Sequence, residues 1–268
     1  MNNVLTVSQL TKSYNKNKVL NNLSFEVKKG EVFGILGMNG AGKTTLLECI
    51  EGYKKYDSGN IQIHGTIGIQ LQTSSLPSYV KVKEALVLFS KWNKTNIDTS
   101  LITALNIHDI ENKTYTQLST GQKRRLHLLL ALFNHPDILF LDEPTAGLDV
   151  EGRIELHEVL RQLQKQGTTI IMTSHDMNEV ESLCDRIVIL HHGTHAYLGT
   201  IDELKKAIHR HHTIQIITKS HVYTYTTHHV AQTLLNILQD FKEKNIDIQD
   251  IKLTQGTLEE HLIYMTKE

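Results

Sequence analysis

The sequence predicts an α/β protein with a mostly parallel central sheet. From residue 137 to residue 190, segments typical of strands alternate with segments typical of helices, which is the order of a parallel sheet covered by helices. The strand within DILFLDEP (137–144) is a continuous apolar run, as expected where both faces of a strand are buried. The β-branched runs at 4–14 and 19–27 predict an antiparallel β part at the N-terminus.

The domain organisation follows from changes in this pattern. Residues 28–30 (KKG) predict a hairpin turn between two N-terminal strands. Residues 74–133 carry apolar side chains at helical spacing and predict an α-helical subdomain inserted into the sheet. Near Gly199 the pattern changes to a helix with a capping box at Thr200 and Glu203, followed by a ββαβα order. We expect a first domain at 1–207 and a small α+β domain at 208–268.

Charge and hydropathy exclude several classes of protein. The formal net charge of −1 does not favour a nucleic-acid partner. The longest apolar runs are far shorter than the ~20 residues that cross a bilayer. The first residues, MNNVLTVSQL, lack the basic start and apolar core of a secretory signal. We therefore expect no signal peptide and no transmembrane segment, and any role at a membrane requires a partner.

A phosphate-binding loop is the strongest local motif. GMNGAGKT (37–44) fits the pattern G-x-x-x-x-G-K-[ST], with a predicted strand before it and a predicted helix after it. Exposed amides in such a loop surround phosphate oxygens. Lys43 is expected to reach the β- and γ-phosphates, the Thr44 hydroxyl to bind Mg²⁺, and Thr45 to reach the α-phosphate. The loop residues expected to contact the nucleotide are Asn39, Gly40, Ala41, Gly42, Lys43, Thr44 and Thr45.

Two carboxylates end the buried strand that follows. The carboxyl end of a parallel strand is where ligands bind, so Asp142 is expected to hold Mg²⁺ and Glu143 to deprotonate the attacking water. Adjacent strand residues point to opposite faces, so both can serve one site only if the chain turns there, and Pro144 favours such a turn.

Two further polar residues complete the expected site. His175 ends the next strand, where it can hydrogen-bond the γ-phosphate. Gln72 lies where the sheet meets the helical block, and its oxygen can touch Mg²⁺ or water; Gln70 is an alternative for the same role.

A second anion-binding feature lies elsewhere in the chain. LSTGQ (118–122) begins a helix, and helix N-termini attract phosphate. The basic run that follows, Lys123 to Arg125, is interpreted as a solvated helix face rather than a nucleic-acid site.

Taken in order, these motifs resemble those of the ATP-binding-cassette (ABC) family over about residues 1–200. GMNGAGKTT resembles Walker A, ILFLDE Walker B, Gln72 the Q-loop glutamine, LSTGQ the family signature, AGLD (146–149) the D-loop, and His175 the switch histidine. By the same resemblance, Tyr14 stacks on adenine with Val19 beside it. Two departures are visible: Met38 replaces a common proline of the loop, and Thr120 replaces the first glycine of the signature.

The resemblance implies an enzyme that hydrolyses ATP with Mg²⁺ and works as a head-to-tail dimer. Ser119 and Gly121, with Gln122 of the same motif, would cap the γ-phosphate held by a second copy of the chain or by a paralogous cassette. It also implies a separate transmembrane permease, docked near residues 74–86, which would hold the chain at the cytoplasmic face of the cell membrane.

The C-terminal part narrows this expectation. GTIDELKKAI (199–208) and the closing TLEEHLIYM (257–265) resemble the tails of bacterial drug- and lipid-type exporter ATPases, so we expect an exporter. The alternative is a cassette without a transport role, such as the iron–sulfur cluster assembly type, which is also a lone cassette.

Overall fold

The computed structural model describes residues 2–15, 17–70, 76–96, 98–208, 212–219, 221–227, 229–244 and 246–255. The chain divides into two compact units, Met1–Leu198 and Gly199–Glu268. This division lies before the helix at 201–208, whereas the sequence pattern places that helix with the first domain.

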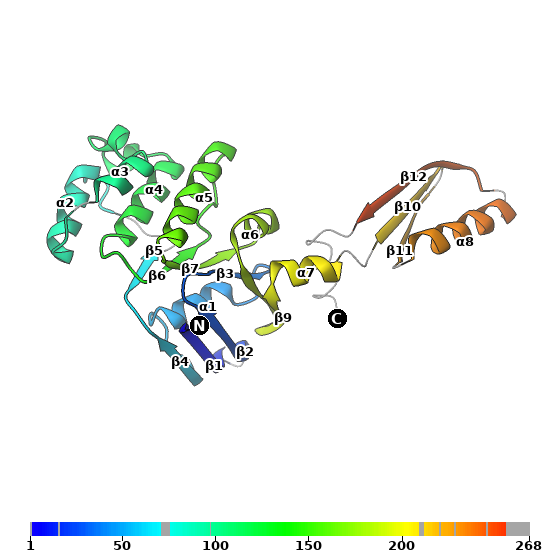
Figure 1. Cartoon of the computed structure of the whole chain (residues 1–268), viewed down its shortest axis with the longest axis horizontal. Helices are drawn as coiled ribbons and strands as arrows, with labels where there is room; N and C mark the ends of the chain where they lie inside the picture. The colour runs from blue at the N-terminus through cyan, green and yellow to red at the C-terminus, as the bar shows by residue number, and fades with distance from the viewer. Residues whose placement is uncertain are drawn as a thin grey trace. The chain divides into compact units, whose positions relative to one another are not determined.

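A six-stranded sheet forms the centre of the first unit (Figure 1). Strands β3, β6 and β7 are buried at every position, because helices or a second sheet cover both of their faces. Neighbouring strands from β5 to β8 pair in parallel, which confirms the predicted α/β class. The strand order is β5 (Ile67–Gln70), β6 (Ile138–Asp142), β7 (Thr169–Ser174), β3 (Val32–Gly37), β8 (Arg186–His191) and β9 (Thr194–Thr200).

The two faces of this sheet are covered differently (Figure 1). Helices α4 (Thr120–Ala131) and α5 (Val150–Lys165) lie on one side. Helix α1 (Lys43–Ile50) lies on the other, between the central sheet and a three-stranded antiparallel sheet. Its strands β2 (Asn17–Lys28), β1 (Asn3–Tyr14) and β4 (Ser58–Ile63) share one apolar core with α1 and the central sheet.

The expected hairpin across residues 28–30 is wrong. The chain does turn there, but β2 and β3 belong to different sheets and do not pair. The reason lies in their burial: β2 buries alternate side chains and therefore faces one core, whereas β3 is buried throughout. The chain leaves one layer at Lys28 and enters the next at Val32.

The predicted helical insertion is present between β5 and β6. It contains α2 (Val82–Asn93), α3 (Thr99–Ala104), two 3₁₀ turns at His108–Ile110 and Tyr115–Gln117, and α4. Helix α3 is short: Asp98 caps its start, and Asn106, with φ of 49°, follows its end. After β7, α6 (Met177–Leu183) returns the chain to β8.

The second unit has its own small core. Helix α7 (Ile201–Ile208) begins with the predicted capping box, in which the amide of Glu203 donates to Thr200 Oγ1 over 3.2 Å. Strands β11 (Val222–Thr227), β10 (His212–Thr218) and β12 (Ile248–Gln255) form an antiparallel sheet, and α8 (Val230–Glu243) packs against it. The predicted last helix, 257–265, lies outside the described residues.

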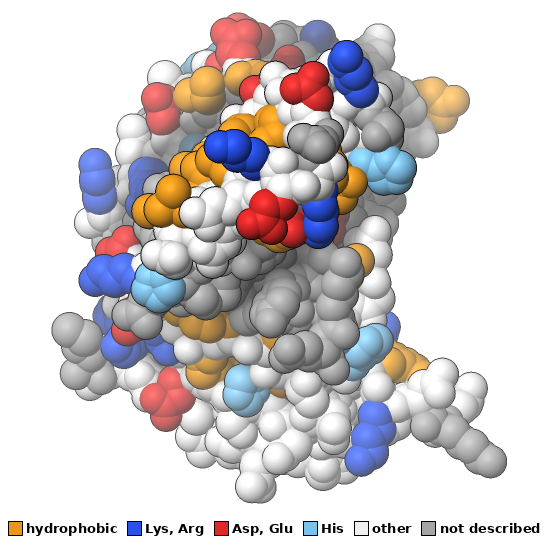
Figure 2. All heavy atoms as spheres, turned by 90° about the vertical axis from the view of Figure 1, so that its right-hand side faces the viewer, with side chains coloured by type: hydrophobic (Ala, Val, Ile, Leu, Met, Phe, Trp, Pro, Cys, Tyr) orange, Lys and Arg blue, Asp and Glu red, His pale blue; other side chains and the backbone are white. Residues whose placement is uncertain are grey.

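Some hydrophobic side chains of this unit remain at the surface. On the face that Figure 2 presents, hydrophobic side chains lie beside charged ones. The exposed apolar residues of the second unit include Val222, Leu235, Ile251 and Leu253.

Candidate functional site

The phosphate loop joins β3 to α1, and two residues show why this sequence forms it. Gly42 has φ of 104°, and a Cβ atom there would lie 2.8 Å from the carbonyl oxygen of Val19, so only glycine fits. Lys43 is 7% exposed, and its Nζ donates to the carbonyl of Gly37 over 2.8 Å. Burial lowers the pKa of Lys43, while the negative charges of Glu143 and Asp142 oppose that shift. The ammonium group is thus held inside the loop by carbonyls and faces two acids.

Walker B ends at a turn that separates its two carboxylates. Asp142 is the last residue of β6 and is 5% exposed, while Glu143 adopts a left-handed φ of 47°. The turn expected at this point is therefore at Glu143 itself, and it aims the second carboxylate away from the ordinary strand direction. Burial raises the pKa of Asp142, the hydrogen bond from Thr173 opposes this, and the Glu143 charge adds to it.

His175 meets Glu143 across the carboxyl ends of neighbouring strands. His175 Nδ1 lies 3.2 Å from Glu143 Oε1, and the histidine side chain is 60% exposed. The two residues come from the ends of β7 and β6, which pair in parallel. This contact brings the expected general base and the expected γ-phosphate sensor together.

Two contributors to this site were missed from the sequence. Thr173 donates to Asp142 and accepts from the amide of Glu143, so one hydroxyl ties both acids. The interpretation of the basic run as a solvated face is wrong: Arg124 donates to the carbonyl of Asp142 over 3.4 Å, and Lys123 lies over the Tyr115 ring. The position of Thr173 two residues before His175 was a signal, whereas nothing local predicted the Arg124 contact.

Ser119, Gly121 and Gln122 lie in a different place from the phosphate loop. Ser119 is the N-cap of α4, and Gln122 reaches back to its amide in a reciprocal capping box. All three residues line a cavity of about 590 Å³, together with 147–149 and the start of α5. No phosphate-loop residue lines this cavity. The structure thus places the start of the signature helix and the phosphate loop at separate surfaces of the chain.

Tyr14 ends β1 with its ring 41% exposed. The ammonium groups of Lys12 and Lys54 lie 5.2 Å and 5.5 Å from the ring centroid. Val19 is half-buried, and its carbonyl borders Gly42. An exposed aromatic ring flanked by cations is suited to a base that carries phosphates.

Gln72 lies outside the described residues. Gln70 ends β5 and is 2% exposed, and its Oε1 has no hydrogen-bond partner within the described chain.

The donor set fits Mg²⁺ and a nucleotide triphosphate. Thr44 supplies an exposed hydroxyl beside the buried Lys43, and Asp142 supplies a carboxylate whose charged form is disfavoured by burial. Hydroxyl and carboxylate oxygens are the ligands that Mg²⁺ prefers. A cation at Asp142 would offset the cost of its burial.

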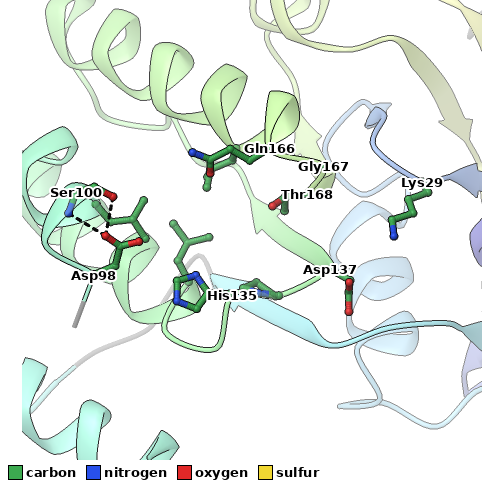
Figure 3. Close-up of a pocket in the computed structure, with 12 residues that line it drawn as sticks. Lys29, Asp98, Ser100, His135, Asp137, Gln166, Gly167 and Thr168 are labelled. Atoms are coloured by element: carbon green, nitrogen blue, oxygen red, sulfur yellow. Dashed lines mark hydrogen bonds between the residues drawn. The ribbon is translucent and has the colours of Figure 1, made fainter. Parts of the chain in front are cut away.

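A second cavity of about 450 Å³ lies at the opposite end of the sheet, beside the starts of β6 and β7 (Figure 3). Its carboxylates are already engaged: Asp98 accepts from Ser100, and Asp137 accepts from Thr66. The phosphate loop, Asp142 and His175 instead lie at the carboxyl ends of β3, β6 and β7, where open parallel sheets bind ligands. Across the described chain, no helix combines the length and apolar character needed to cross a bilayer.

The fold and site define a phosphate-loop ATPase whose signature helix lies apart from its own loop. The family model described as ABC transporter matches residues 20–146. The chain is 36% identical over 206 residues to an uncharacterized ABC transporter ATP-binding protein of Methanocaldococcus jannaschii, covering 75% of this chain and 79% of that protein. The chain therefore belongs to the ABC transporter family as an ATP-binding protein, and it is an ATPase.

Other relatives carry more specific names. The Nod factor export ATP-binding protein I of Rhizobium meliloti is 39% identical over 207 residues, covering 70% of this chain and 62% of that protein. The daunorubicin resistance ATP-binding protein DrrA3 of Streptomyces coeruleorubidus is 29% identical over 301 residues, covering 98% of this chain and 95% of that protein. A solved ATP-binding subunit of an ABC transporter aligns with a TM-score of 0.69 at 25% identity, covering 76% of this chain and 92% of that chain. These comparisons confirm the predicted family and fold.

Proposed function

We propose that this chain is the ATP-hydrolysing subunit of an ABC exporter and drives a separate transmembrane permease. The observation that carries the catalytic part is the 3.2 Å contact between His175 and Glu143, beside Asp142 and Lys43. The names of the Nod factor export and daunorubicin resistance relatives support export. The second of these matches extends over nearly all of this chain, including the second unit, which we propose is an accessory domain at about 208–268.

Each site residue has a role that its surroundings support. Glu143 takes a proton from the attacking water, and His175 donates a hydrogen bond to the γ-phosphate. Lys43 neutralises the β- and γ-phosphates. Thr44 and Asp142 would hold Mg²⁺, with Gln72 as the third expected ligand, and bound Mg²⁺ supplies charge neutralisation at the phosphates. Tyr14 stacks on the base, with Val19 beside it.

The separated signature supports an ATP-dependent dimer. Ser119 and Gly121 line a cavity without any residue of their own phosphate loop. A head-to-tail pair would place them against the γ-phosphate held by a second copy or by a paralogue. Because ATP would bind best between two closed cassettes, ATP favours the dimer. Hydrolysis of ATP then allows the two cassettes to separate.

An exposed apolar surface on the helical insertion supports a permease contact. Leu88 and Trp92, on α2, are 55% and 77% exposed, and Tyr79 just before the helix is 87% exposed. Clustered exposed apolar side chains are typical of interaction surfaces. This surface follows Gln72 in the chain, so it is suited to transmit nucleotide binding. Docking there would hold the chain at the cytoplasmic face of the cell membrane.

The test is a pull-down from detergent-solubilised native membranes with ATP-loaded Glu143→Gln, followed by mass spectrometry. We expect a multi-span membrane protein in stoichiometric amount. Trp92→Asp should abolish its capture, whereas Ile154→Asp, which changes an exposed apolar residue of α5, should not. Recovery of soluble partners alone would favour the alternative, a cassette without a transport role.

A further inference from the structure

Three residues of helix α5, in one row, contact α6 or the residue directly before it. The α5 side chains are spaced four residues apart and their partners on or before α6 three residues apart, so each set lies on one helix face. Arg153 contacts Asp176 at 2.9 Å, and Arg161 donates to the carbonyl of Ser182. His157 lies between them, with Nε2 3.8 Å from Glu179 Oε1 and Nδ1 3.5 Å from Ser182 Oγ. His175 lies in the short turn between the end of β7 at Ser174 and the N-cap of α6 at Asp176, so this row fixes the helix that follows the histidine.

Glu179, at the centre of the row, is a buried acid. It is 3% exposed, and its Oε2 accepts the Ser174 hydroxyl over 2.5 Å. Its Oε1 has no hydrogen-bond partner within the described chain, and neither does the facing Nε2 of His157. Burying a carboxylate is costly unless it is hydrogen-bonded, so the bond from Ser174 is needed to keep Glu179 in this place.

The Glu179 contact anchors the residues on both sides of His175. Ser174, which donates to Glu179, ends β7 directly before the histidine, and its Oγ also accepts from the amide of Asp176 over 3.0 Å. His175 therefore projects from a backbone held at the preceding and following positions, although its own side chain is 60% exposed. Because the backbone on both sides of His175 is held, the imidazole can reach only a limited set of positions.

Helix α5 also contacts the signature helix. Glu155 Oε2 lies 2.8 Å from Arg125 of α4. Helix α5 thus contacts both the signature helix α4, which Ser119 caps, and helix α6, which follows His175.

We propose that Glu179, supported by His157, is a positioning residue that holds His175 through Ser174 in the orientation needed at the γ-phosphate. This inference rests on the proposed role of His175. Glu179 itself touches no reacting atom; it acts through the hydroxyl of Ser174 and the start of α6.

The first experiment compares Glu179→Ala with Glu179→Gln in the full chain, measuring kcat and KM for ATP and the melting temperature. Displacement of a reacting group by about 1 Å can cost up to ~100-fold in rate, so we expect Glu179→Ala to lower kcat roughly 10- to 100-fold. KM should stay within about twofold, because binding depends on the phosphate loop. Glu179→Gln keeps an acceptor for Ser174 and should restore most of kcat.

The second experiment is a double-mutant cycle with Ser174→Ala, whose kcat should fall as in Glu179→Ala. If both act through one hydrogen bond, the double variant should be no slower than the slower single variant. Glu158→Ala, an exposed neighbour of His157 on α5, is the matched control and should keep wild-type kcat. Should Glu179→Ala not fold, Ser174→Ala and His157→Ala still test the proposal through kcat.

Three results would overturn the inference: wild-type kcat in Glu179→Ala, equal loss in Glu179→Gln, or multiplying effects in the cycle. His175→Ala is measured in parallel. If His175→Ala keeps wild-type kcat, the proposed function of His175 fails; if His175→Ala loses activity and Glu179→Ala does not, only the positioning role fails.

Discussion

The hydroxyl of Thr173 lies 2.5 Å from Oδ1 of Asp142. Thr173 is on β7 and Asp142 on β6, and the hydroxyl oxygen of Thr173 also accepts a hydrogen bond from the amide of Glu143 over 2.9 Å. The Thr173 hydroxyl therefore orients both Asp142, the proposed Mg²⁺ ligand, and the backbone turn at Glu143, the proposed general base.

Replacing Thr173 by valine keeps the shape and removes both hydrogen bonds. Partners that orient a metal ligand typically contribute ~10- to 100-fold to metal affinity or activity, so Thr173→Val should raise the Mg²⁺ concentration for half-maximal ATPase about 10-fold. A Mg²⁺ titration of steady-state hydrolysis measures this. Thr173→Ser retains the hydroxyl and should behave as wild type; equal values for Val and Ser would contradict the role.

Glu143→Gln tests the general base. Loss of such a base usually costs ~10²–10⁴ in rate, so hydrolysis should fall by that range while ATP still binds. ATP should also trap a dimer, which gel filtration with and without nucleotide detects. Glu158→Gln, an exposed acid of α5, is the control. Near-wild-type turnover in Glu143→Gln would remove Glu143 from this role.

Ser119→Asp separates the capping of helix α4 by Ser119 from its proposed contact with the γ-phosphate held by a partner cassette. Aspartate caps a helix as well as serine does, so the melting temperature should hold. The added negative charge should repel the partner's phosphate and lower ATPase activity by at least about 10-fold. Ser119→Ala should show the converse structural effect, a loss of about 1 kcal/mol in stability. Full activity in Ser119→Asp would argue against contact with the γ-phosphate.

Tyr14 can be tested through ATP affinity. Stacking of a base on an aromatic ring contributes ~1–3 kcal/mol, so Tyr14→Ala should raise KM for ATP roughly 5- to 100-fold. The ring is remote from the chemistry in this role, so kcat should change little. Tyr14→Phe keeps the stacking surface and is the control. An unchanged KM in the alanine variant would show that the base binds elsewhere.

Glu51, which follows α1, predicts a pH dependence of stability. Burial raises its pKa to about 8, with Asp142 and Glu48 adding to the shift, and both carboxylate oxygens lack hydrogen-bond partners in the described chain. The folded state therefore binds more protons than the unfolded state between about pH 4.5 and 8, so this group makes stability fall as pH rises through that window.

Glu51→Gln removes this titration. Melting temperatures of the variant and the wild type should agree near pH 4.5, and the variant should be more stable above pH 8. Thermal unfolding across pH 4.5–9 measures the difference, with the exposed Glu158→Gln as control. A constant difference at every pH would show that Glu51 does not titrate in this range.

The sequence by itself determined the order of strands and helices, the phosphate loop and the capping box at Thr200 and Glu203. These depend on short-range physics: Gly42 adopts a positive φ of 104°, which glycine reaches without steric cost, and Thr200 and Glu203 are close enough in the chain to cap each other. Residues 138–141 are all apolar, and such a continuous apolar run predicts a strand that is buried on both faces.

Only the tertiary structure decided which distant groups meet. It placed β2 and β3 in separate sheets, turned Glu143 toward His175, and set Arg124 against the carbonyl of Asp142. It also buried Glu179 opposite His157. These three side-chain contacts join residues that are 18 or more positions apart, and their geometry follows from strand order and helix packing, which no local pattern of residues encodes.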